Sequence, residues 1–153
     1  MLETLIRLFK YDDWANGETL RSLRAMAPPP ARAVKLLAHI MSTEWLWLER
    51  MRGVKRSFAV WPEWTLDEIE AQLPKLKREW KVFLGEKKPP DLALRFQYTN
   101  TKGEHYSSTI GETAMHVAMH GAYHRGQIAL LVRDGGGEPA YTDFIEAARK
   151  QKI

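Results

Sequence analysis

The 153-residue sequence contains no cysteine. This absence excludes disulfide bonds, thiolate metal ligands, iron–sulfur clusters and a cysteine nucleophile belonging to the protein itself. No window approaches the roughly 18 apolar residues of a membrane-spanning helix, and residues 1–7 lack the basic and apolar regions of a secretory signal. We therefore expect a cytoplasmic protein that has no membrane partner.

Several catalytic motifs are absent as well. The sequence has no His-Glu-x-x-His, Gly-x-Ser-x-Gly, Walker loop or dinucleotide-binding glycine pattern. These absences argue against zinc peptidases, serine hydrolases, nucleotide triphosphatases and dehydrogenases. No Glu-x-x-His pair lies on an inward helical face, which disfavours a ferritin-like di-iron site.

The composition is that of an ordinary globular chain. Hydrophobic residues make up 44% and charged residues 27% of the sequence, so a single folded domain over residues 1–153 is expected. The net charge is +4, with 23 basic residues offset by 19 acidic ones along the chain. This balance is typical of a solvated surface, and no nucleic-acid partner is expected.

Apolar residues recur at steps of three and four in four segments, which predicts four helices of about 20 residues. The segments begin at Leu2, near Ala33, at Thr65 and near Ser108 or Thr109, and they end before Pro28, at Gly53, near Phe83 and at Gly135. Asp67 and Glu68 stand in the first turn of the third segment, and Glu112 is placed as a capping glutamate in the fourth. Pro74 is a position where the third helix can kink.

Two shorter elements accompany the predicted helices. Leu92, Leu94, Phe96 and Tyr98 alternate with polar residues, and the turn residues 100–103 follow, which predicts a short β-hairpin up to residue 108. A short C-terminal helix is predicted around residues 143–150. The economical fold is an all-α four-helix bundle, with a hairpin excursion between the third and fourth helices.

The histidines form the most informative pattern. His116, His120 and His124 are four residues apart on the fourth predicted helix, so their rings lie along one side of it. His120 and His124 have the spacing that lets two imidazoles bind one metal ion. His39 lies on the inward face of the second predicted helix, so it is the expected third ligand.

A buried histidine is most often a core residue that is hydrogen-bonded to a neighbour. Burying several neutral imidazoles among apolar residues, however, costs roughly 1–3 kcal/mol for every hydrogen bond left unmade. A divalent metal ion removes that cost, and three imidazoles leave a coordination position open, as in catalytic sites. Zinc is the first expectation and nickel the second. The open position suits either a water molecule or a thiol.

Further polar residues are candidates for the surroundings of the metal. Asp12 and Asn16 interrupt the apolar stripe of the first predicted helix, where they either face water or bond to a ligand histidine or a substrate. Glu44 and Gln127 are weaker candidates for the same role. His116 is expected to pack above the site, and His105 is expected to lie solvated in the hairpin.

Segments of the sequence follow one another in an order that is typical of a known family. They are YDDWAN at 11–16, HIMSTEWLWL at 39–48 and HVAMHGAYHRGQI at 116–128, supported by FQY at 96–98, GE at 103–104 and DFI at 143–145. In these segments the chain resembles the DinB/YfiT-like superfamily of damage-inducible metal-binding bundles, over nearly its whole length.

The resemblance implies an up-down-down-up four-helix bundle, often a homodimer, that holds nickel, zinc or a similar divalent ion. The family's ligands fall on His39, His120 and His124 of this sequence. Tyr123 departs from the family pattern, because many relatives carry a further histidine there that is not a ligand. Characterised members are similar to thiol S-transferases that use a low-molecular-weight thiol such as bacillithiol or mycothiol, and some are thiol-dependent isomerases.

The leading hypothesis is therefore a metal-dependent transferase that joins a small thiol to an electrophile, with Asp12 or Asn16 orienting the thiolate. One alternative is a hydrolase with activated water in the open coordination position. Another is a non-catalytic, metal-binding stress protein in which the ion ties two helices together.

Overall fold

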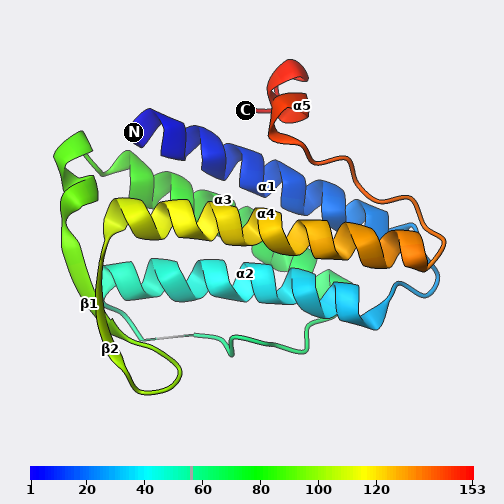
Figure 1. The fold of residues 1–153 in the computed structure, drawn as a ribbon, viewed down its shortest axis with the longest axis horizontal. Helices are drawn as coiled ribbons and strands as arrows, with labels where there is room; N and C mark the ends of the chain where they lie inside the picture. Colours follow the sequence, from blue (N-terminus) through cyan, green and yellow to red (C-terminus); the bar gives the residue numbers. More distant parts are fainter. Residues whose placement is uncertain (56) are drawn as a thin grey trace.

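The computed structural model describes residues 1–55 and 57–153, and its main feature is four long helices (Figure 1). These are α1 (Leu2–Arg24), α2 (Ala31–Arg52), α3 (Leu66–Gly85) and α4 (Ile110–Asp134). The shorter elements are the 3-10 helix η1 (Pro89–Ala93), the strands β1 (Arg95–Thr99) and β2 (His105–Thr109), and α5 (Phe144–Arg149). The predicted all-α bundle with its hairpin and C-terminal helix is confirmed.

The long helices follow the up-down-down-up order. Helix α2 returns antiparallel to α1, α3 runs in the same direction as α2, and α4 runs back alongside α1 (Figure 1). Parallel neighbours require the chain to recross the length of the bundle, which explains the long connection between α2 and α3. In that connection, the Trp61 ring lies against His39 of α2 and 6.5 Å from the His124 ring of α4.

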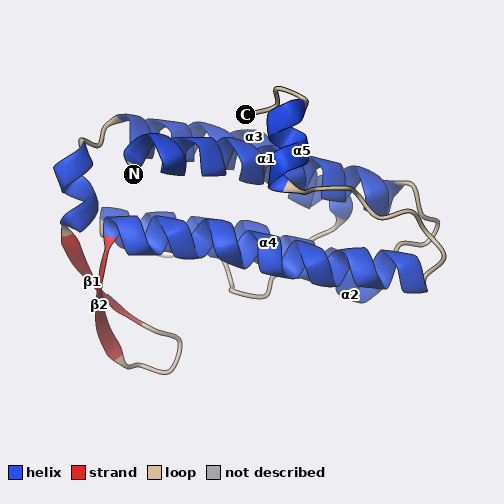
Figure 2. Ribbon diagram, turned by 45° about the horizontal axis from the view of Figure 1, so that its top comes forward, coloured by secondary structure: helices blue, strands red, loops and turns tan. Residues whose placement is uncertain are grey.

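The helices form two layers (Figure 2). One layer contains α1 and α3, and the other contains α2 and α4. The layers meet where α1 packs against α4 and where α2 packs against α3. The apolar core fills the space between them with fully buried side chains from all four helices, among them Leu5, Leu37, Met41, Ile69 and Ile128.

Local sequence signals set the ends of the helices. Thr65 and Thr109 cap α3 and α4, and each forms a reciprocal capping box with the glutamate three residues later. Gly53 ends α2 in the left-handed conformation, with a φ of 69°, which glycine adopts without a steric penalty. Helix α3 continues through Pro74.

The segment before the hairpin differs from the prediction. Leu92 belongs to η1 and Leu94 follows it, so the strand begins only at Arg95. Pro89 and Pro90 start the 3-10 turn because proline fixes φ at a helical value and needs no amide partner in a first turn. The turn buries Leu92 against the core.

A group of charged and amide side chains lies inside the bundle, and we call Asp12, Asn16, Glu44 and Arg125 the polar core cluster. Arg125 Nη1 donates to Asp12 Oδ1 at 2.6 Å and to Asn16 Oδ1 at 2.7 Å. Asn16 Nδ2 in turn donates to Asp12 Oδ2 and to Glu44 Oε1, both at 3.0 Å. The cluster joins α1, α2 and α4 by bonds made away from water, where they are strong.

The charges of the cluster follow from its burial. Desolvation, and then the neighbouring Asp12 carboxylate, raise the pKa of Glu44 well above its usual range, which favours its neutral form. Burial opposes the charge of Arg125, but Asp12 and Tyr11 together more than offset it, so the pKa of Arg125 is raised. The cluster is therefore an ion pair beside an acid whose neutral form is favoured.

No helix within residues 1–55 and 57–153 combines the length and the apolar character needed to cross a membrane.

Gly121 makes room for the ion pair, and its replacement tests the cluster. A Cβ atom at residue 121 would lie 2.6 Å from Asp12 Oδ1 and 2.9 Å from Arg125 Nη1. We expect Gly121→Ala to lower the free energy of unfolding by about 1–3 kcal/mol, as overpacking does. Gly126→Ala is the matched control on the same helix, since a Cβ atom there meets nothing within 4 Å. It should leave stability unchanged or raise it by up to about 1 kcal/mol. Urea unfolding measures both, and equal stabilities would contradict this account.

Candidate metal centre

Three histidines from two helices point their rings at one another. His39 comes from α2, while His120 and His124 lie one turn apart on α4. The Nε2 atom of His120 lies 3.2 Å from that of His39 and 3.1 Å from that of His124. His39 is buried, and the other two histidines are half-buried. The structure thus brings together the three residues that the spacing selected.

Each of these rings has a partner on its other nitrogen. His39 Nδ1 donates to the carbonyl oxygen of Val60 at 2.8 Å, and His124 Nδ1 donates to Gln127 Oε1 at 2.9 Å. The Thr43 hydroxyl donates to the His39 carbonyl oxygen, so its lone pair faces His120 Nδ1 at 3.4 Å. These contacts place the hydrogens on Nδ1 and leave the Nε2 lone pairs free.

Three bare Nε2 atoms facing one another suit a cation. Without one, acceptors would meet acceptors with no hydrogen between them, which is costly in a partly buried site. With metal–nitrogen bonds of about 2.1 Å, separations of 3.1–3.2 Å correspond to angles near roughly 100° at the ion. The residues present therefore fit a divalent metal bound by three imidazoles.

The remaining predicted residues lie in different places. Asp12 and Asn16 are each only 1% exposed, so they do not face water. Their hydrogen-bond partners are Arg125, Glu44 and each other, and within the described residues neither is bonded to a ligand histidine. The apolar stripe of α1 is interrupted at Asp12 and Asn16 because both residues belong to the buried polar core cluster.

The other predicted residues are Gln127, His116 and His105, and only Gln127 contacts a histidine of the group through a hydrogen bond. Gln127 does contact His124. His116 lies one turn before His120, with its ring 5.5 Å from Trp47 and 5.7 Å from His120, and it is outside the three-histidine group. His105 is exposed on the hairpin, where it meets Thr99.

Sequence reasoning missed the contribution of the loop between α2 and α3. Trp61 stacks on His39 with ring centroids 3.6 Å apart and an angle of 5° between the planes. Val60 supplies the acceptor for His39, and Ser42 donates to the same carbonyl oxygen at 2.7 Å. A loop has no periodicity, so the pattern of the sequence gave no signal for these contacts.

A comparison with known proteins identifies the family of the chain. The model of the DinB family matches residues 1–152. The chain belongs to the DinB family. Protein DinB of Bacillus subtilis (strain 168) is 26% identical to the chain over 163 residues, which cover 94% of this chain and 93% of that protein. Family membership and the histidine group together fit a metal-binding DinB protein.

The ligand set of this DinB-family chain is tested by metal content. We expect about one divalent ion per chain in the wild type and almost none in His120→Ala or His124→Ala, because each loses one of three imidazole donors. His116→Ala is the matched control, one turn away on the same helix, and it should keep its metal. Mass spectrometry of protein purified without chelators measures all four. Equal metal content in the three variants would overturn the assignment.

The metal-free protein should lose stability on acidification. Burial, and then the neighbouring His124 and His39, lower the pKa of His120 to about 3. The unfolded chain takes up that proton near pH 6.5, so stability falls as pH drops from about 6.5 towards 3.

Between pH 7 and pH 5 this effect should cost about 2 kcal/mol, or about 1.4 kcal/mol per pH unit below 6.5. Urea unfolding in the presence of a chelator measures it. His120→Gln removes the titrating ring and should show a shallower loss over the same range. An identical pH dependence in the wild type and the variant would refute this explanation.

Proposed function

We propose that the protein is a metal-dependent transferase that joins a low-molecular-weight thiol to an electrophilic small molecule. The observation that carries the proposal is the convergence of three imidazole lone pairs at a half-exposed position. Three protein ligands leave room for an exogenous ligand, which is a property of catalytic rather than structural metal sites. Zinc and nickel both suit this donor set.

A divalent ion bound there would lower the pKa of a coordinated thiol, so that the thiolate form predominates at neutral pH. In the overall reaction, the thiol sulfur forms a bond to the electrophilic carbon as the bond to the leaving group breaks. The thiol proton leaves to solvent or with the leaving group. No redox partner is needed.

The thiol has to come from outside the chain, because the sequence has no cysteine. This absence also protects the reaction, since a cysteine near the site would compete for the same electrophile. Two small molecules, a thiol and an electrophile, would therefore meet at the metal centre. The role of the protein would be the detoxification of electrophiles under stress.

The residues of the chain hold the ligands in one orientation. Val60, Thr43 and Gln127 fix the ring tautomers so that every Nε2 lone pair faces inward. Trp61 and Tyr123 flank the centre with exposed rings, 48% and 67% accessible. These two rings provide apolar surface on which the body of an electrophile can pack.

A thiol-transfer assay tests the proposal. We expect zinc- or nickel-loaded protein to accelerate the loss of a bacterial thiol such as bacillithiol in the presence of 1-chloro-2,4-dinitrobenzene. His124→Ala should reduce the rate at least ~100-fold, towards the uncatalysed level, because the metal is lost. His116→Ala should retain most of the activity.

The same assay separates the alternatives. Metal-dependent hydrolysis of esters or amides without added thiol would favour the hydrolase. Absence of turnover with any thiol, together with a large fall in melting temperature on chelation, would favour a metal that only ties α2 to α4.

A further inference from the structure

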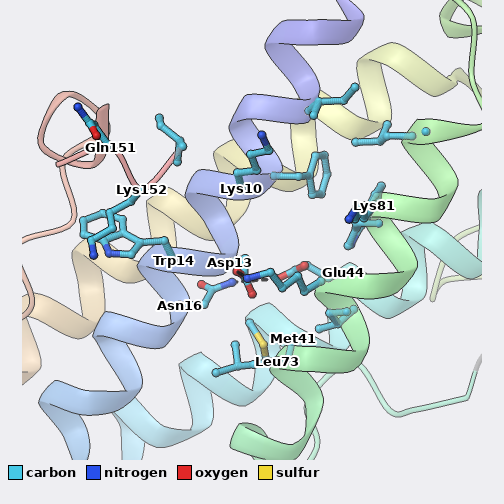
Figure 3. Close-up of a pocket in the computed structure, with 18 residues that line it drawn as sticks. Lys10, Asp13, Trp14, Asn16, Met41, Glu44, Leu73, Lys81, Gln151 and Lys152 are labelled. Atoms are coloured by element: carbon cyan, nitrogen blue, oxygen red, sulfur yellow. Dashed lines mark hydrogen bonds and ion pairs between the residues drawn. The ribbon is translucent and has the colours of Figure 1, made fainter. Parts of the chain in front are cut away.

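A large cavity lies away from the metal centre, between α1 and α3 (Figure 3). Its volume is about 870 Å³, which is within the range of small-molecule sites. Its described lining residues come from α1, α2, α3 and the segment after α5, and they do not include the three histidines. The cavity is thus a second site, on the opposite side of the bundle from the loop that carries Trp61.

The walls of the cavity are apolar. Phe9 and Trp80 stack with ring centroids 4.0 Å apart, and they line the cavity together with Ile6, Leu73, Leu76 and Leu84. These side chains come from two helices that face each other, so an elongated apolar group inserted between them would be covered on both sides.

The rim of the cavity is positively charged. Lys10 on α1 and Lys81 on α3 line the cavity from the two facing helices (Figure 3). Lys77 is also at the rim, but it pairs with Asp13 at 2.8 Å. Among the described residues, neither Lys10 nor Lys81 has a carboxylate within 4.0 Å. Two ammonium groups are therefore available to an anion.

The lining also includes two tryptophans, Trp14 and Trp80. The indole N–H groups of Trp14 and Trp80 are buried and have no acceptor among the described residues. The Trp80 side chain as a whole is only 2% exposed. The acceptors at the floor are already engaged, since Asn16 binds Glu44 and Arg125. Neighbouring atoms shield both N–H groups, so recognition of a ligand would rest on the lysines and the apolar walls instead.

We propose that this cavity binds an amphipathic organic anion, with a carboxylate at Lys10 and Lys81 and a medium-length apolar chain between α1 and α3. The lysines supply charge complementarity at the opening, and the aromatic and aliphatic walls bury the chain. Burial raises the pKa of Glu44 at the floor and favours its neutral form, which limits its repulsion of an anion. The site is independent of the thiol chemistry, because its residues and those of the metal centre do not overlap.

Calorimetric titration with sodium decanoate, below its micelle concentration, tests this site in the full-length protein. We expect saturable one-to-one binding that weakens about fivefold to tenfold in the double variant Lys10→Gln/Lys81→Gln, because two ion pairs are lost. The matched control is Lys35→Gln/Lys102→Gln, which removes the same charge from positions outside the cavity and should bind as the wild type does. Decanol, which lacks the anionic group, should bind the wild type more weakly than decanoate.

A second variant tests the apolar part of the site. Leu73 is a half-buried wall residue, and Leu73→Trp should narrow the space between α1 and α3 and weaken decanoate binding. Leu73→Ala enlarges the cavity instead, and it should shift the preference towards dodecanoate. Circular dichroism and metal content confirm that each variant keeps its fold.

Several results would overturn the proposal. They are no decanoate binding by the wild type, equal weakening in the two double variants, full binding by folded Leu73→Trp, or association only with phosphatidylglycerol vesicles. The wild type stripped of metal should bind decanoate as the loaded protein does, so failure of the thiol assay and failure of this site are separate outcomes.

Discussion

The buried ion pair between Asp12 and Arg125 sets the rotation of α4, on which the metal centre depends. Arg125 and Gly121 face α1, where the guanidinium meets the Asp12 carboxylate at 2.6 Å. His120 and His124 each precede one of these residues, so they are turned by about 100° around the helix. That turn directs both rings towards α2 and His39. A rotation of α4 that separated the histidines from His39 would also leave two charges buried and unpaired.

The same constraint explains why α4 carries glycine at its centre. Glycine in a helix interior is unfavourable by roughly 0.5–1 kcal/mol relative to alanine, yet a side chain at Gly121 would collide with the ion pair. The helix gives up intrinsic helical propensity there so that α1 can approach closely enough for Asp12 to reach Arg125.

Periodicity and capping residues were enough to predict the four helices and the histidine group, because each signal is local. Thr109 and Glu112 mark the start of α4, and the spacing from His120 to His124 follows directly from the helical repeat. His39 was accessible to the same reasoning, since it interrupts an apolar face. The residues that contact His39 from outside the helices were harder to predict, because Val60 and Trp61 lie in a loop that is positioned only by tertiary contacts.

The polar core cluster is the part of the structure that was hardest to predict from the sequence. Asp12 and Asn16 stood out in the sequence as polar residues on an apolar stripe, but their partner Arg125 is more than a hundred residues away. A single sequence does not say which of its many arginines will be buried. Without that pairing, orienting a thiolate and facing water were both reasonable roles for Asp12, and the structure gives it a different one.

The cluster also separates the two sites electrostatically. Glu44 and Asn16 line the floor of the cavity, whereas Asp12 and Arg125 lie against α4 behind the histidines. Asp12 and Arg125 form an ion pair and burial favours the neutral form of Glu44, so the cluster adds little net charge between the two sites. The positive charges at the cavity are its lysines, of which Lys77 pairs with Asp13. On the other side, burial lowers the pKa of His39 and of His120, which favours the neutral state in which an imidazole binds a metal ion.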